Sequence, residues 1–159
     1  MLDTVNGLPA HVLLLHVVVV LLPIAALMTV LGAAWPAARA RLGVVTPALA
    51  LVVLVLCPIT IKAGEWLQNR LDPKRANPAI VRHASLGHTL LPWAIGVFLV
   101  ALAVWLLDRR YRSVLPTRVT AVVTVLAVVV GGGATIQLYR IGDSGAHAAW
   151  DDVQKLPRG

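Results

Sequence analysis

Four long apolar runs, separated by short polar connections, dominate the chain. Each run is close to the roughly 20 residues that an α-helix needs to cross the hydrocarbon core of a bilayer. The pattern therefore predicts one all-α integral membrane domain over residues 1–159, a four-helix transmembrane bundle with up-down topology. The predicted helices cover about residues 9–35, 44–63, 79–107 and 117–140. An outer tail, residues 141–159, follows the last helix.

Composition supports a membrane location. Hydrophobic residues make up 58% of the chain and charged residues 13%, and the mean hydropathy of +0.82 is too high for an ordinary soluble domain. The net charge of +7 would suggest nucleic acid in a soluble protein, but the basic residues lie between apolar runs and are typical of membrane flanks. We therefore expect the lipid bilayer as partner and no nucleic acid, and leave a homo-oligomer open. Cys57, the one cysteine, excludes an intramolecular disulfide and a cysteine-based zinc or iron–sulfur site on this chain.

The two short connections indicate the orientation in the membrane. Short loops rich in Lys and Arg favour the cytoplasm, and the chain has no basic residue before Arg39. The opposite side holds more basic residues in total, but they are spread over a longer loop and the tail and alternate with acidic ones. We therefore expect a retained first helix and both termini outside. The arginines of the short connections are Arg39, Arg41, Arg109, Arg110, Arg112 and Arg118.

Histidines repeat a spacing of five residues in the first and third predicted helices, as His11 with His16 and His83 with His88. These two helices run in the same direction in an up-down bundle. His11 should therefore match His83 in depth, and His16 should match His88 roughly 8 Å deeper. This is a weak two-hairpin internal repeat with two tiers of imidazole. A spacing of five turns a helix by about 500°, so any shared site must be built across helices.

The deeper tier suggests a cofactor. His16 and His88 are candidate axial ligands of a b-type haem, because membrane bundles place axial imidazoles on facing helices. The chain would then be a redox or electron-transfer subunit with a quinone or a redox protein as partner.

Two other interpretations remain open. One is a divalent metal site, since imidazole and carboxylate suit zinc or copper. The other is a non-catalytic scaffold or assembly protein whose polar side chains satisfy one another at the bundle mouth, with Lys62 and Asp143 in that network. A serine nucleophile constellation and a phosphate-binding loop are both lacking in the sequence, so we expect no stand-alone catalysis. The candidate metal ligands are His11, His83, His147 and Glu65.

Prolines and glycines within the apolar runs predict local irregularities. Pro23, Pro58 and Pro92 should each remove one backbone donor and bend a helix. The three glycines at 131–133 would be costly in a lone helix, so they suggest a close approach to another helix.

Four segments, LPAHVLLLHVVVVLLPIAAL, AGEWL, HASLGH and IGDSGAHAAW, together resemble a bacterial family of small four-helix membrane proteins, domain-of-unknown-function family 2231. The resemblance spans nearly the whole chain. Family members typically carry a His-Pro pair before a second histidine; here His11 and His16 fit, whereas Val12 replaces the proline. The resemblance implies a bacterial inner membrane, and some relatives precede a Rieske-type iron–sulfur domain, which favours the redox interpretation. It supplies no catalytic residues.

The same resemblance suggests one contact. In the family pattern the third helix commonly begins H-A-x-L-G-D and the tail reads G-H-S-G, whereas this chain has His88 and Asp143 at the two variable places. The acidic and the imidazole side chain have thus exchanged places. Two residues in contact can exchange in this way, because the Asp–His hydrogen bond forms whichever helix carries the Asp. We therefore expect His88 to contact Asp143.

Overall fold

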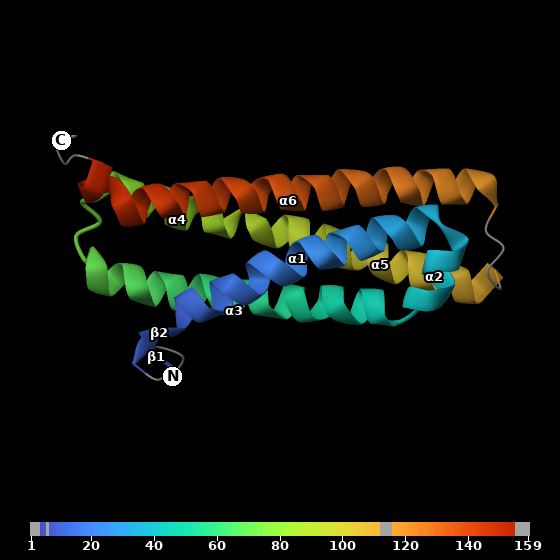
Figure 1. The fold of residues 1–159 in the computed structure, drawn as a ribbon, viewed down its shortest axis with the longest axis horizontal. Coiled ribbons are helices and arrows are strands. Elements are labelled where there is room, and N and C mark those ends of the chain that lie inside the picture. Colours follow the sequence, from blue (N-terminus) through green and yellow to red (C-terminus); the bar gives the residue numbers. More distant parts are fainter. Residues whose placement is uncertain (1–3, 6, 112–115, 155–159) are drawn as a thin grey trace.

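The structure, a computed structural model, describes residues 4–5, 7–111 and 116–154 (Figure 1). For residues 5 and 151–154 only the backbone is described. Arg112, in one of the short basic connections, and residues 155–159 of the predicted tail lie outside the described residues.

In this part of the chain, two short strands precede six helices. The strands pair antiparallel just before the first helix. The bounds are β1 Thr4–Val5, β2 Leu8–Pro9, α1 Ala10–Ala34, α2 Pro36–Leu42, α3 Val45–Leu71, α4 Pro78–His88, α5 Leu90–Tyr111 and α6 Thr117–Gln154.

The long helices α1, α3, α5 and α6 form an antiparallel bundle, as Figure 1 shows. All four are long and apolar enough to cross a membrane, with α4 and α5 together forming the third span, Pro78–Tyr111. The predicted all-α transmembrane bundle is therefore confirmed. The segment 141–154, which we expected as part of a tail, continues α6 as helix.

Local residue chemistry explains the helix ends that the hydrophobic pattern does not show. Pro36 occupies the first turn of α2, where its missing donor costs nothing, and Gly43 ends that helix with φ +47°. Pro92 lacks the amide that would bond the His88 carbonyl, and the helix breaks at Thr89 between α4 and α5. Pro23 lies within α1, as predicted.

Small residues bring the helices together in the core. Ala25, Ala50, Ala94 and Ala134, one from each long helix, belong to the largest buried cluster, and such residues let helix backbones approach closely in a membrane. Both α1 and α5 pack against α3 and against α6. The hairpin α1–α3 and the hairpin of α4–α5 with α6 therefore occupy equivalent places, which matches the predicted two-hairpin repeat.

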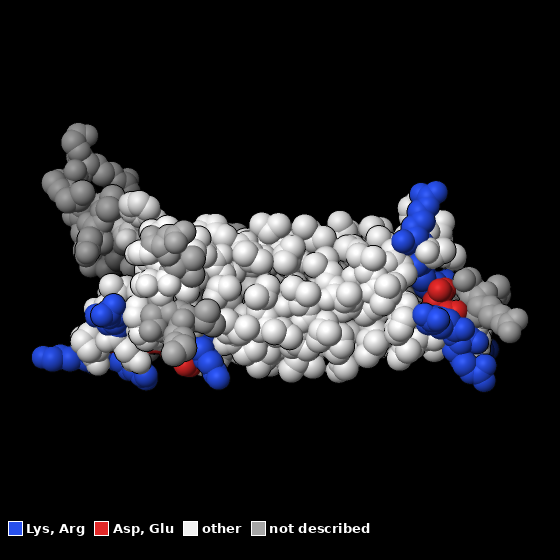
Figure 2. Space-filling view, turned by 90° about the horizontal axis from the view of Figure 1, so that it is seen from below, with Lys and Arg blue, Asp and Glu red and all other residues white. Residues whose placement is uncertain are grey.

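Charge is confined to the two ends of the bundle. On the face in Figure 2, Lys, Arg, Asp and Glu lie at both ends and leave an uncharged belt between them. Large apolar side chains such as Leu27, Leu99 and Val125 are exposed, as expected where a helix faces lipid. The end that carries His11, His83 and the α3–α4 connection is called the histidine end below. The end that carries α2 and Arg39 is called the arginine end.

Candidate functional site

The clearest polar cluster at the histidine end is a pair of imidazoles, one from α1 and one from α4. The rings of His11 and His83 have centroids 6.3 Å apart and planes at 79° to each other. Both side chains are half-buried. The predicted match in depth between these two histidines is therefore confirmed.

Each ring of this pair is held by a backbone carbonyl of its own hairpin. His11 Nδ1 donates to the Thr60 carbonyl oxygen over 2.9 Å, and His83 Nδ1 lies 3.1 Å from the Ile141 carbonyl oxygen. Because a carbonyl can only accept, Nδ1 of His11 carries the proton. His83 Nδ1 also lies 3.1 Å from Ser144 Oγ, whose hydroxyl donates to the Ile141 carbonyl over 2.8 Å, so the same tautomer completes this set of hydrogen bonds. Nε2 of each neutral imidazole therefore keeps its lone pair, the arrangement found in histidines that ligate metals.

A glycine lies against each ring, one helical turn after the carbonyl that holds it. A Cβ atom added at Gly64 would lie 2.9 Å from His11 Cε1, and one added at Gly145 would lie 3.0 Å from His83 Cε1. The two hairpins thus contain the same arrangement. A histidine bonds a backbone carbonyl of the facing helix, and its ring lies against the glycine four residues after that carbonyl. Sequence reasoning missed both glycines, although AGEWL and DSGAH carry them.

The deeper tier is not built in the same way. His88 Nε2 lies 3.2 Å from Glu65 Oε1, with both side chains about half exposed. His16 is exposed, and its Nδ1 donates to the Val12 carbonyl oxygen of its own helix. The two predicted haem ligands, His16 and His88, therefore have separate partners in this structure. In the repeat, the residue after Gly64 is Glu65 but the residue after Gly145 is Ala146, so His16 lacks the equivalent carboxylate.

The four-residue metal site is not assembled either. Among the described residues, no group of three or more His, Cys, Asp or Glu side chains is close enough to hold one ion. His147 is exposed and its Nδ1 lies 3.7 Å from Asp143 Oδ1 on the same helix, while Glu65 faces His88. The sequence placed His147 and Glu65 with His11 and His83 from depth alone, and depth does not fix which side of a helix faces the centre.

The predicted contact between His88 and Asp143 is also wrong. Asp143 pairs with His147 one turn along α6, and His88 pairs with Glu65 on α3. The exposed Lys62 lies on α3, three residues before Glu65. Three separate polar pairs therefore replace the continuous network that the sequence suggested.

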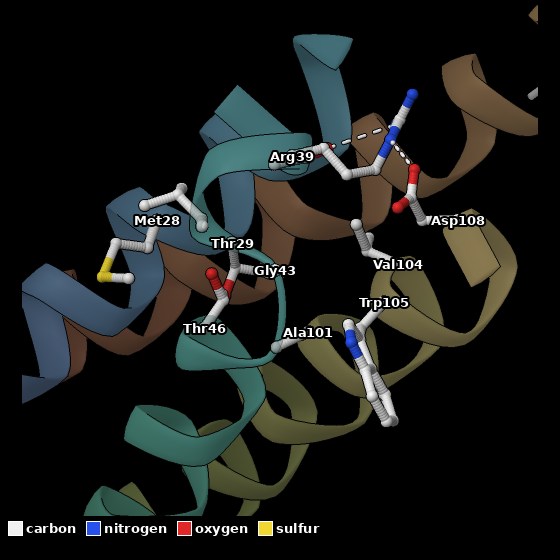
Figure 3. A pocket seen from close by; sticks show the side chains of 11 residues that line it. Met28, Thr29, Arg39, Gly43, Thr46, Ala101, Val104, Trp105 and Asp108 are labelled. Carbon is white, nitrogen blue, oxygen red and sulfur yellow. Dashed lines mark hydrogen bonds and ion pairs between the residues drawn. The ribbon is translucent and has the colours of Figure 1, made fainter. Parts of the chain in front are cut away.

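At the arginine end, sequence reasoning missed a buried ion pair. Arg39 Nε lies 3.0 Å from Asp108 Oδ1, with side chains 3% and 18% exposed. Arg39 Nη1 also donates to the carbonyl oxygens of Gly32 and Ala33, at the C-terminal end of α1. Figure 3 shows this pair at the edge of a small cavity of about 10 Å³, which Thr29 also lines. Asp108 is the one acidic residue in the two short basic connections, and that signal could have found the pair.

Comparison with known proteins identifies the family. The family model described as predicted membrane protein, DUF2231, matches residues 7–155. The comparisons with curated proteins and with solved structures found no match. The matched region includes the four long helices and all five histidines. This chain therefore belongs to the DUF2231 family of predicted membrane proteins.

Proposed function

We propose that this chain is a membrane redox subunit that holds one redox centre between His11 and His83. The observation that carries the proposal is the ring pair: two imidazoles from equivalent positions of two hairpins, 6.3 Å apart, each anchored through Nδ1. A backbone acceptor on Nδ1 fixes the tautomer and raises the basicity of Nε2. The ligand role thus moves from His16 and His88 to the other tier.

A b-type haem suits this pair because it needs only two ligands from the protein. The two imidazoles, whose ring centroids are 6.3 Å apart, would hold such a group through their Nε2 atoms. When bound, a haem would supply a reversible one-electron step at iron. The chain fixes both rings through the Thr60 and Ile141 carbonyls and leaves them room at the two glycines.

A single copper ion is the second candidate. A single ion, unlike a macrocycle, needs no space beyond that between the two imidazoles, whose ring centroids are 6.3 Å apart. Imidazole nitrogens suit copper. Both centres give the same class of function, one-electron transfer at the histidine end, and they differ in their absorption spectra.

The spectrum of the purified protein tests the proposal. Expressed with ample haem precursor and copper, the protein is expected to carry a Soret band, or bound copper if the ion is the centre. His11→Ala and His83→Ala should each reduce the bound centre at least tenfold, because losing one of two ligands removes about half of the protein's bonds to the metal. Absorption and metal analysis measure both outcomes.

The exposed histidines provide matched controls. His16→Ala and His147→Ala should retain the centre, since each ring bonds within its own helix. A wild-type protein that is folded, colourless and free of copper would support the scaffold interpretation instead, in which the ring pair only braces α1 against α4. Loss of the centre in His16→Ala but not in His11→Ala would contradict the assignment.

The orientation belongs to the same proposal. The arginine end, with its short basic connections, would face the cytoplasm of a bacterial inner membrane, and the histidine end would face outside toward a quinone or a redox protein. Reporter fusions after Arg41 and after Arg110 are expected to give cytoplasmic signals, and a C-terminal fusion an outside signal. A cytoplasmic C-terminus would overturn this orientation without affecting the ring pair.

A further inference from the structure

A polar depression lies beside the ring pair, between α4 and α6. It has a volume of about 330 Å³. Ala79 and Arg82, one turn apart on α4, form one wall, and Asp143, Ser144 and His147, within one turn of α6, form the other. The depression opens to the outside of the protein, and Ser144 connects it to the ring pair, because Ser144 Oγ lies 3.1 Å from His83 Nδ1.

The internal repeat allows the depression to be compared with the equivalent place in the first hairpin. Aligning Thr60 with Ile141 and Gly64 with Gly145 sets the Asp143, Ser144 and His147 positions against Lys62, Ala63 and Trp66 in the first hairpin. One hairpin therefore carries an acid, a hydroxyl and an imidazole where the other carries a lysine, a methyl group and an indole. The chemistry of the depression is specific to the second hairpin.

A hydrocarbon core of ordinary thickness, bounded by Asp108 and His88, would place the depression at the lipid headgroups. Asp108, at the arginine end, and His88 lie about 20 residues apart, so the helix between them spans roughly 30 Å, the thickness of the hydrocarbon core. Arg82 lies about six residues beyond His88, roughly 9 Å further out. Bilayer headgroups occupy about 5–8 Å on each side of the hydrocarbon. The long Arg82 side chain can reach this layer.

Two aromatic residues lie before and after Asp143 on the same side of α6. Tyr139, Asp143 and Trp150 fall within about 40° of one another around the helix. Tyr139 is 74% exposed and Trp150 61% exposed. Tyrosine and tryptophan concentrate at membrane–water interfaces, where their polar atoms meet the headgroups. Asp143 therefore lies between two interfacial anchors.

The charges of the two walls are complementary to a zwitterion. Arg82 presents a guanidinium group, which binds phosphate oxygens in a planar, two-point geometry. Across the depression, Asp143, whose Oδ1 lies 3.7 Å from His147 Nδ1, offers a carboxylate to an ammonium group. The Nδ1 atom of His147 bonds the Asp143 carbonyl oxygen over 2.9 Å, which directs its Nε2 away from the helix backbone as a further polar contact.

We propose that this depression binds a phosphoethanolamine group, with the phosphate on Arg82 and the ammonium on Asp143. The depth and the flanking aromatics favour a phospholipid as the carrier of that group. A free phosphoethanolamine molecule offers the same chemistry from solution. The inference is independent of any redox centre between His11 and His83.

Lipid retention measured by native mass spectrometry tests the proposal. The full-length protein is exchanged in detergent against equal amounts of phosphatidylethanolamine, phosphatidylglycerol and phosphatidylcholine. We expect phosphatidylethanolamine to be retained about tenfold more than either of the others, because the glycerol lipid lacks the ammonium and the choline lipid lacks N–H donors. Arg82→Gln and Asp143→Asn should each abolish this preference.

Lys62→Gln, at the equivalent position of the first hairpin, is the matched control and should keep the preference. Competition with free phosphoethanolamine identifies the carrier: displacement only at large excess supports a lipid site, and displacement at equal concentration supports the same chemistry with a soluble ligand. Equal retention of the three lipids would overturn the proposal. A preference that survives both Arg82→Gln and Asp143→Asn would overturn it as well.

Discussion

Arg39→Ala is expected to lower the free energy of unfolding in detergent by about 3–5 kcal/mol, the cost of breaking a buried ion pair. The Arg39 side chain is 3% exposed and its partner Asp108 is 18% exposed. Without Arg39, the carboxylate stays largely buried with no cation, and the Gly32 and Ala33 carbonyls lose their donor. Chemical denaturation followed by tryptophan fluorescence measures the loss.

Two further variants separate the ion pair from general damage. Arg41 is exposed in the same short helix α2, so Arg41→Ala should change stability by less than about 0.5 kcal/mol. The double variant Arg39→Leu with Asp108→Leu should lose less than Arg39→Ala, because an apolar pair leaves no buried charge behind. If Arg39→Ala lowered the free energy of unfolding by less than about 1 kcal/mol, water would have to solvate the Asp108 carboxylate in place of Arg39, and the prediction would be wrong.

Gly133→Ala is expected to destabilise the bundle by about 1–3 kcal/mol through overpacking. A Cβ atom at this position would overlap the ring of Trp93 on α5, which is half-buried against the main core cluster. The prediction that the three glycines allow a close approach is confirmed at Gly131 as well, where a Cβ atom would lie 3.3 Å from Ala26 Cβ. Thermal unfolding in detergent measures the effect.

The neighbouring glycine is the control. A Cβ atom at Gly132 would meet nothing within 4 Å, so Gly132→Ala should be neutral or stabilising by up to about 1 kcal/mol, because alanine is the better helix former. Trp93→Leu combined with Gly133→Ala should recover part of the loss. Equal stability of the two single variants would mean that the Trp93 ring moves aside freely.

The four spans could be predicted because their cause is local, although α3 runs eight residues and α6 fourteen residues past the predicted ends. A run of about 20 apolar residues has no stable alternative to a membrane-spanning helix, and α1, α3, α5 and α6 follow the four runs. Asn77 caps α4 by accepting from the Ala79 amide over 3.0 Å, as its place before Pro78 indicates. Sequence reasoning missed the break at Thr89. It expected Pro92 to bend one continuous helix, whereas the helix breaks three residues before that proline.

The sequence by itself determined the spans, the gathering of polar residues at two ends, and the equal depth of His11 and His83, because all three follow from position along a helix. Only the tertiary structure decided which histidines meet. His11 and His16 point about 140° apart, so these two side chains of α1 cannot face the same neighbour. The long helices are apolar on nearly all sides, so no polar stripe marks which side turns inward. Packing against Gly64 and Gly145 selected the outer tier, His11 and His83, and left His16 exposed.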